Sequence, residues 1–235
     1  MTTDCRDDSL VVPEPTKPEP NVWPSDSESW EGFSQRIANE AKAANPRVVF
    51  IGDSITQGWS SEGLAEWNTR FKPLPSVNFG MGGDRTQNIL WRVQHGAFNG
   101  ISPDLIVLNI GVNNIWTEVQ VCGTEKVAEG IFEVIHSIHK ANPMAKILVV
   151  AILPTQELPD NPLRAYLSEI NQLTQSNLSS LGSQFSFVDI GGCFLNDNGT
   201  IKNTVMTDFC HLSAEGYRIY ADSIEPIITS LLNMA

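Results

Sequence analysis

Five short runs of apolar, mostly β-branched residues recur along the chain, and they constrain its fold more than any other feature. The runs are VVFIG at 48–52, VNFG at 77–80, LIVLNIG at 105–111, KILVVAIL at 146–153 and FSFVDI at 185–190. Most are continuous rather than alternating, which is typical of parallel strands covered on both faces. The runs therefore predict strands inside a sheet that has helices on both sides.

Helical patterns lie between these runs, with apolar residues at helical spacing. Asp84 stands three residues before Gln87, which is the spacing of a capping box, and Gly182 suits a helix C-cap. The last helix should begin near Ser213 and be kinked or interrupted by Pro226. The earlier helices are expected within 28–46, 84–93, 125–140 and 162–182. This alternation predicts a three-layer α/β/α domain with a five-stranded, mainly parallel sheet, which suits the flavodoxin-like strand order 2-1-3-4-5.

The first 26 residues differ from the rest, because five prolines stand there among acids and serines. This composition predicts an extended, flexible leader over residues 1–26, followed by a single domain over residues 27–235. The leader lacks the basic start and the long apolar core of a signal peptide. A chain of 235 residues is long enough for one hydrophobic core without a disulfide or a structural metal.

Charge and cysteine usage exclude several classes of partner. A formal net charge of -12 argues against nucleic acid or an anionic membrane as the main partner. No apolar run approaches the roughly 18–20 residues that would span a bilayer. The four cysteines are scattered without a CxxC pair, which favours free thiols in a reducing compartment. We therefore expect a cytoplasmic protein without a membrane span.

Chemically useful side chains follow four of the five predicted strands. GDS follows the first strand, GMGGD the second and GVNN the third, while TDFCHLS comes after the fifth. In open parallel sheets ligands bind beyond the carboxyl ends of the strands, so these segments should meet at one edge. Together they offer a serine, a glycine-rich turn, side-chain amides and an Asp-x-x-His pair, which are the parts needed for acyl transfer.

Each part has a distinct role in that chemistry. Ser54 would attack the ester carbonyl, and His211 would accept its proton and later give it to the leaving alcohol. Asp208, three residues before His211, can hold the imidazole in the required tautomer. The negative oxygen of the tetrahedral intermediate needs fixed donors, for which the candidates are the backbone N–H groups of Ser54 and Gly83 and the side-chain amide of Asn113.

Other interpretations exist for these and neighbouring residues. A serine after a strand is commonly only a helix cap, and we interpret Asp53 as a cap of local N–H groups rather than a catalytic acid. His136 and His139 share a helix face, but no further ligand accompanies them, so we expect no metal and no cofactor. Thr56 stands where a GxSxG elbow would have its second glycine, which disfavours the α/β-hydrolase fold.

Four blocks, IGDSITQ, NFGMGGDRT, IGVNN and DFCHLS, together resemble those of the SGNH or GDSL hydrolases. Within that family the chain is particularly similar to the catalytic subunits of type I platelet-activating factor acetylhydrolase, as NFGMGGDRTQNILWRVQHG and DFCHLSAEGY indicate. The resemblance implies a triad of Ser54, Asp208 and His211, and an oxyanion hole of Ser54, Gly83 and Asn113. It also implies a possible homodimer and a WD-repeat regulatory partner.

The resemblance further implies a small acyl pocket formed by Ile55, Val112 and Cys210. Cys210 stands where that group usually has a leucine, which would widen the pocket. The expected activity is that of a serine esterase acting on short-chain, above all acetyl, esters of a phospholipid or a sugar through a covalent acyl-enzyme. Three alternatives stay open: a carbohydrate O-acetylesterase, a lysophospholipase or thioesterase with a longer acyl channel, and a non-catalytic interaction protein.

Overall fold

The computed structural model describes residues 14–23, 28–116 and 118–233. At its centre lies a five-stranded sheet in the order β2-β1-β3-β4-β5, in which every neighbouring pair is parallel. The strands are β1 (Val48–Gly52), β2 (Ser76–Gly80), β3 (Leu105–Asn109), β4 (Lys146–Val150) and β5 (Phe185–Val188). The predicted α/β class, the five parallel strands and the flavodoxin-like order are confirmed.

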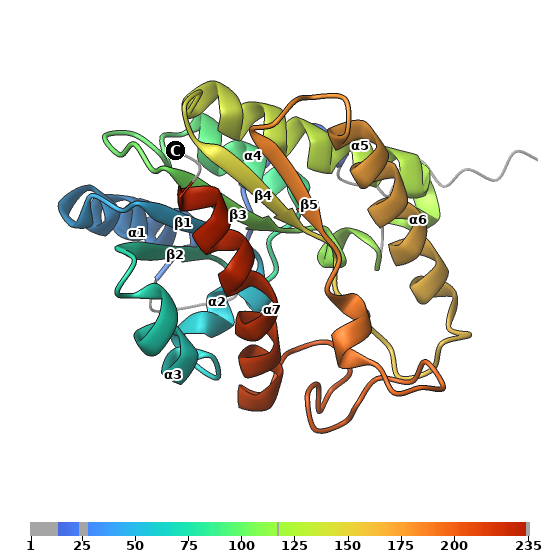
Figure 1. Ribbon diagram of the computed structural model, residues 1–235. Helices are drawn as coiled ribbons and strands as arrows, with labels where there is room; N and C mark the ends of the chain where they lie inside the picture. Colours follow the sequence, from blue (N-terminus) through green and yellow to red (C-terminus); the bar gives the residue numbers. More distant parts are fainter. Residues whose placement is uncertain (1–13, 24–27, 117, 234–235) are drawn as a thin grey trace, which may run out of the picture.

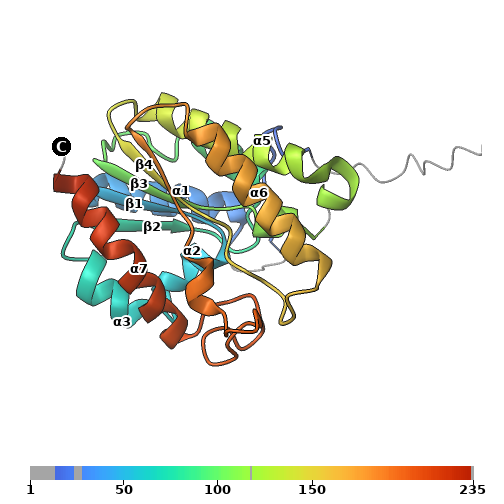
Figure 2. The same ribbon diagram turned by 45° about the vertical axis from the view of Figure 1, so that its right-hand side comes forward.

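Helices cover both faces of this sheet, as Figures 1 and 2 show. α4, α5 and α6 lie on one face, α3 and α7 lie on the other, and α1 runs beside the β2 edge. Among the described helices, none is long and apolar enough to cross a bilayer. The helix bounds are α1 (Trp30–Ala44), α2 (Ser54–Gln57), α3 (Leu64–Glu66), α4 (Thr86–Gln94), α5 (Glu118–Ala141), α6 (Pro162–Leu178) and α7 (Ala214–Asn233), with short turns η1 (Gly58–Ser60), η2 (Trp67–Phe71), η3 (Val112–Asn114) and η4 (Gly191–Phe194).

The core follows the apolar patterns of the sequence. Every residue of β1 and β3 is buried, as expected for strands covered on both faces. On α5 the apolar stripe of Val127, Ile131, Ile135 and Ile138 is also buried. The helix packs this stripe against the sheet, and burial of such side chains is the main favourable term in folding.

Two local predictions were wrong, and a third was wrong in part. Arg85, not Asp84, caps α4, because the Arg85 N–H donates to Asn88 Oδ1 at 2.8 Å while the Asp84 carboxylate turns into the core. α6 ends at Leu178, so Gly182 lies in the following loop, where its φ of +102° requires glycine. Pro226 lies inside α7 without interrupting it, so the predicted interruption is wrong and the predicted kink stays a prediction.

Residues 14–23 of the predicted leader lie against the helices of the domain. The Thr86 hydroxyl donates to the Pro15 carbonyl at 2.8 Å, and the Asn88 amide donates to the Glu19 carbonyl at 2.9 Å. Figure 2 shows this dark blue segment beside α5, where a Cβ at Gly130 would lie only 2.7 Å from the Pro15 carbonyl oxygen. The rest of the predicted leader lies outside the described residues, and its boundary with the domain stays a prediction.

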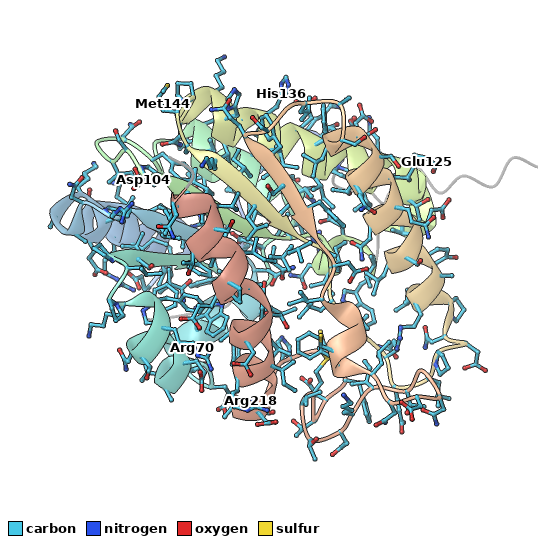
Figure 3. All side chains as sticks on the ribbon, in the orientation of Figure 1. Arg70, Asp104, Glu125, His136, Met144 and Arg218 are labelled. Atoms are coloured by element: carbon cyan, nitrogen blue, oxygen red, sulfur yellow. The ribbon has the colours of Figure 1, made fainter. Side chains whose placement is uncertain are left out.

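Charged side chains join α3 and η2 to α7 at the surface. Arg70 forms ion pairs with Glu66, Asp222 and Glu225 at 2.7–2.8 Å. Figure 3 shows Arg70 and Arg218 beside these elements. Partly exposed pairs of this kind contribute little individually, and their joint effect here is to link two segments on one face of the sheet.

Close backbone contact brings α2 onto the ends of β1 and β2. A Cβ at Gly52 would overlap the Asn109 carbonyl oxygen and the Thr56 hydroxyl, and one at Gly80 would overlap the Gln57 backbone. Glycine at these strand ends therefore lets the helix that begins with Ser54 sit directly on the sheet edge.

We predict that Gly52→Ala lowers the free energy of unfolding by about 1–3 kcal/mol, since the added methyl group overlaps fixed backbone rather than a mobile side-chain end. The matched control is Gly192→Ala, because an added Cβ at Gly192 meets nothing within 4 Å. Urea unfolding of both variants measures the difference. Equal stability of the two variants would contradict the proposed close contact.

Candidate active site

Ser54 is the first residue of α2, and the helix is held from two sides. Asp53 caps it, as predicted, because its Oδ1 accepts the Ile55 N–H at 2.9 Å. On the other side the buried Tyr217 hydroxyl of α7 donates to the Ile55 carbonyl at 2.6 Å. These contacts fix the backbone beside the Ser54 hydroxyl, and Ser54 itself is only half-buried.

The structure brings the three predicted triad residues together in one hydrogen-bonded chain. Ser54 Oγ lies 3.0 Å from His211 Nε2, and His211 Nδ1 lies 2.7 Å from Asp208 Oδ2. The side chains of His211 and Asp208 are 55% and 54% exposed, so the chain lies at an open surface. This arrangement matches the nucleophile–base–acid geometry of serine hydrolases.

The loop that carries Asp208 and His211 is tightly folded. Asp208 Oδ1 accepts the backbone N–H groups of Cys210 at 3.0 Å and His211 at 2.7 Å. Phe209 between them has a φ of +57°, a strained value for a bulky residue. Its carbonyl is anchored by the Gln156 N–H and the Thr155 hydroxyl, both at 2.9 Å. The β4–α6 loop thus holds the acid and base in place.

Electrostatics favour the charged form of Asp208. Partial burial raises the pKa of this carboxyl, but hydrogen bonds from the His211 ring and backbone and from the Cys210 N–H outweigh burial and hold the pKa below its usual range. A carboxylate that stays ionised can stabilise the imidazolium that forms when the base takes a proton.

A tight turn, Met81–Asp84, carries the predicted oxyanion glycine. The Asp84 N–H closes it by donating to the Met81 carbonyl at 3.1 Å, and Gly83 in its third position has a φ of +75°, as a type II turn requires. Gly83 is exposed, and within the described part of the chain its N–H donates to no backbone or side-chain acceptor. A Cβ at the preceding Gly82 would lie 4.0 Å from Ser54 Cβ, which places the turn beside the nucleophile.

Side chains hold this turn from the α2 and η3 sides. Gln57 Oε1 accepts the Gly82 N–H at 2.9 Å. Asn113 Nδ2 donates to the Asp84 carbonyl at 2.9 Å, which uses one of the two amide hydrogens of that side chain. Within the described part of the chain, the second hydrogen of Asn113 donates to no protein acceptor.

A buried ion pair supports the turn from inside the core. Arg92 Nη1 lies 2.9 Å from Asp84 Oδ2, and both side chains are fully buried. Arg92 also donates to the Phe79 carbonyl at 2.8 Å, and the Trp30 indole donates to Asp84 Oδ1 at 2.6 Å. Burial raises the pKa of Asp84 to about 6, although Arg92 and Trp30 act in the opposite direction.

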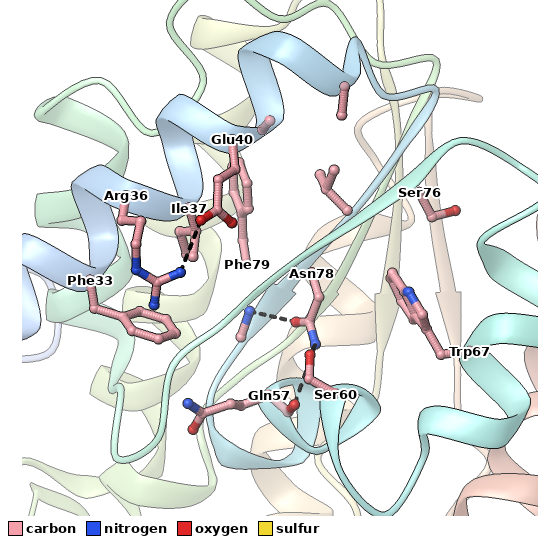
Figure 4. Close-up of a pocket in the computed structure, with 14 residues that line it drawn as sticks. Phe33, Arg36, Ile37, Glu40, Gln57, Ser60, Trp67, Ser76, Asn78 and Phe79 are labelled. Carbon is pink, nitrogen blue, oxygen red and sulfur yellow. Dashed lines mark hydrogen bonds and ion pairs between the residues drawn. The ribbon is translucent and has the colours of Figure 1, made fainter.

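The predicted acyl-pocket residues lie close to the site in sequence but differ in exposure. Ile55 and Val112 are each 2% exposed and belong to the core, and the partly buried Cys210 packs against it. Their role toward an acyl group stays a prediction. A separate cavity of about 490 Å³ opens beside the β2 edge, and Figure 4 shows Phe33, Gln57 and Asn78 among the residues that line it.

The histidines at helical spacing have aromatic neighbours. The His136 ring stacks on Phe132, and the His139 ring meets Phe185 edge-on. Across the residues that the structure describes, no three His, Cys, Asp or Glu side chains gather as a metal site would need.

Sequence reasoning missed the supports of the site rather than its central residues. Tyr217, Gln57 and Arg92 hold α2 and the oxyanion turn, yet they lie outside the strand-end segments that directed the search. Their partners lie on other elements of the fold, so the local sequence pattern gives no signal for them.

Comparison with known proteins shows which family the chain is similar to. The model of the GDSL-like lipase/acylhydrolase family matches residues 50–219. The alpha2 subunit of platelet-activating factor acetylhydrolase IB from Rattus norvegicus is 36% identical over 203 residues, which cover 86% of this chain and 85% of the relative. The alpha1 subunit from Homo sapiens is 32% identical over 203 residues, which cover 86% of this chain and 84% of the relative.

Two bacterial proteins of solved structure share the fold. A GDSL-like lipase from Bacteroides thetaiotaomicron aligns with a TM-score of 0.65 at 24% identity, covering 84% of this chain and 97% of that one. An acetylxylan esterase from Geobacillus stearothermophilus aligns with a TM-score of 0.59 at 17% identity, covering 75% and 91%. At such identities the similarity establishes the fold alone.

The buried carboxyl of Asp53 should make the stability of the protein depend on pH. Burial raises the pKa of its carboxyl to about 7, and the charge of Asp84 adds to the shift. Among the described residues, the buried Oδ2 atom has no hydrogen-bond partner. Between about pH 4, the usual value for an aspartate, and pH 7, the folded protein holds a proton that the unfolded chain has released, so Asp53 makes the wild type less stable as pH rises.

We therefore expect Asp53→Asn, which has no proton to lose, to gain stability relative to the wild type as pH rises from 5 to 8. Urea unfolding of both proteins across this range gives the difference in the free energy of unfolding, in which the groups common to both largely cancel. A difference that does not change with pH would contradict the raised pKa of Asp53.

Proposed function

Because the chain belongs to the GDSL-like lipase/acylhydrolase family, we propose that it is a serine esterase that hydrolyses short-chain, above all acetyl, esters through a covalent acyl-enzyme. The observation that carries this proposal is the unbroken hydrogen-bonded chain from Ser54 through His211 to Asp208, with a free N–H group at Gly83 beside it. An interaction protein on this scaffold would not need that chain to be intact.

In the first half of the reaction, Ser54 Oγ attacks the ester carbonyl carbon while His211 Nε2 accepts the hydroxyl proton. The tetrahedral intermediate collapses, the bond to the leaving alcohol breaks, and His211 gives its proton to the alkoxide. Water then attacks the acyl-serine, again with His211 as the base, and the carboxylic acid leaves as Ser54 recovers its proton. Asp208 keeps the imidazole oriented throughout and stabilises its charged form.

The oxyanion of each tetrahedral intermediate needs donors that are already in place. The N–H groups of Ser54 and Gly83 and the second amide hydrogen of Asn113 supply them in this proposal. Donors fixed before the reaction require no reorganisation when the charge develops, so they act most strongly in the transition state.

Different observations support the acyl part and the alcohol part of the proposed substrate. For the acyl part, the support is that the curated relatives are named acetylhydrolases. The exposed Asp208 and His211 leave the leaving-group side open to a bulky alcohol. A phospholipid and an acetylated sugar both suit that opening. The homodimer, the WD-repeat partner and the cytoplasmic location stay predictions.

The test is hydrolysis of p-nitrophenyl acetate, butyrate and octanoate by the wild type, by Ser54→Ala and by the control Ser60→Ala, which removes a nearby hydroxyl bound to Asn78. We expect the acetate to be cleaved best, and only Ser54→Ala to abolish activity. Preference for octanoate would indicate a long-chain lipase or thioesterase, whereas equal rates for wild type and Ser54→Ala would refute the serine mechanism.

Asn113→Ala should lower kcat by about 100- to 1,000-fold with a small change in KM, because the lost donor acts mainly on the transition state. Steady-state kinetics on p-nitrophenyl acetate measures the two constants separately. An unaltered kcat would remove Asn113 from the mechanism.

A further inference from the structure

The N-terminal segment reaches the oxyanion turn itself. The Trp23 indole Nε1–H donates to the Gly82 carbonyl at 2.9 Å, and Asn21 Nδ2 donates to Asp84 Oδ1 at 3.4 Å. Trp23 is partly buried, and its ring packs on Phe33 of α1 with centroids 5.2 Å apart. A residue far from the predicted catalytic blocks thus binds the peptide unit that joins Gly82 to Gly83.

The geometry of that peptide unit explains why the contact matters. A trans peptide is planar, and its carbonyl oxygen and amide hydrogen point in opposite directions. The carbonyl oxygen of Gly82 and the N–H of Gly83 belong to the same unit, so a donor that fixes the one also fixes the other. Trp23 holds the oxygen on its own side and leaves the Gly83 N–H directed away from Trp23.

Without the hydrogen bond from Trp23, little would hold the Gly82–Gly83 peptide unit in one orientation. Both flanking residues are glycines, which adopt positive and negative φ with similar ease. Rotation of the unit by half a turn would exchange the positions of its oxygen and its N–H. A carbonyl oxygen would then occupy the place of the donor and would repel the developing oxyanion instead of binding it.

We propose that Trp23 is a positioning residue for the oxyanion hole, whose indole N–H holds the Gly82–Gly83 peptide in the orientation that presents the Gly83 N–H to the reacting oxygen. The inference rests on the proposed role of Gly83 as an oxyanion donor. Asn21 supports the same turn by donating to the Asp84 carboxylate. Gln57 accepts the Gly82 N–H, which belongs to the preceding peptide unit, between Met81 and Gly82.

The kinetic test compares Trp23→Phe, which keeps an aromatic ring but removes the donor, with Phe33→Leu, which disturbs the packing of the same ring and leaves the donor. For Trp23→Phe we expect kcat on p-nitrophenyl acetate to fall about fivefold to tenfold with KM unchanged, the size expected for one hydrogen bond. Phe33→Leu should lower the melting temperature without this loss of kcat. Equal kcat losses in both variants would overturn the proposal.

A transition-state mimic gives a second kinetic readout. A trifluoromethyl ketone binds when Ser54 Oγ bonds to its carbonyl carbon, the Ser54 proton moves to His211, and the ketone oxygen takes the negative charge. Its inhibition constant should rise in Trp23→Phe by the same factor by which kcat falls. Wild-type affinity for the ketone in Trp23→Phe would overturn the proposal.

A third readout does not depend on esterase activity. In protein labelled with 15N-glycine, the Gly82 and Gly83 amide signals of Trp23→Phe should broaden or split as the peptide samples two orientations, whereas Phe33→Leu should keep single sharp signals. Unchanged signals in Trp23→Phe would refute the positioning role even if the enzyme proved inactive. Loss of the proposed function, in contrast, would show as wild-type inactivity on every ester.

Discussion

Direct backbone contact between α2 and the sheet edge sets the position of Ser54, the proposed nucleophile. Glycines at the ends of β1 and β2 lack the Cβ that would hold the helix away, so Ser54 begins α2 immediately above the strands. The Tyr217 hydroxyl then binds the Ile55 carbonyl from α7. α7 begins at Ala214, three residues after His211. The helix that holds Ser54 through α2 therefore also holds the loop that carries His211, the proposed base. One hydrogen bond therefore couples two segments that are remote in sequence.

The buried ion pair of Asp84 and Arg92 fixes the geometry of the 81–84 turn more than it stabilises the fold. A fully buried ion pair adds little net stability, because desolvation of both charges offsets much of their attraction. Asp84 and Arg92 nevertheless connect the oxyanion turn, the Phe79 carbonyl of β2 and the Trp30 indole of α1. An apolar pair of equal volume would fill the same space without fixing the direction of any carbonyl. The pair thus specifies one arrangement of the turn beside Ser54.

The sequence predicted the sheet and the central residues because both follow from local patterns. Continuous apolar runs mark buried parallel strands, and the strand-end rule places Ser54, Gly83 and His211 at one edge. Asp84 was misassigned because its spacing to Gln87 imitates a capping box, whereas its partners Arg92 and Trp30 are set by tertiary packing. No sequence signal marks the positive φ of Phe209, since the contacts that impose it come from the β4–α6 loop. Composition carries no information on what residues 14–23 contact, so their docking against α4 and α5 could not be predicted.

Those contacts change how the site must assemble. Prolines restrict the unfolded segment in advance, so less conformational entropy is lost when it docks. The carbonyls of Pro15 and Glu19 accept hydrogen bonds from α4, which brings Trp23 to the Gly82 carbonyl. His211 arrives from the other end of the chain, next to α7. Contacts of such long sequence separation form slowly, because a large loop must close before they are made. In the proposed mechanism Ser54 follows β1 directly in sequence, whereas His211 and Trp23 reach the site only through docking of the two ends of the chain.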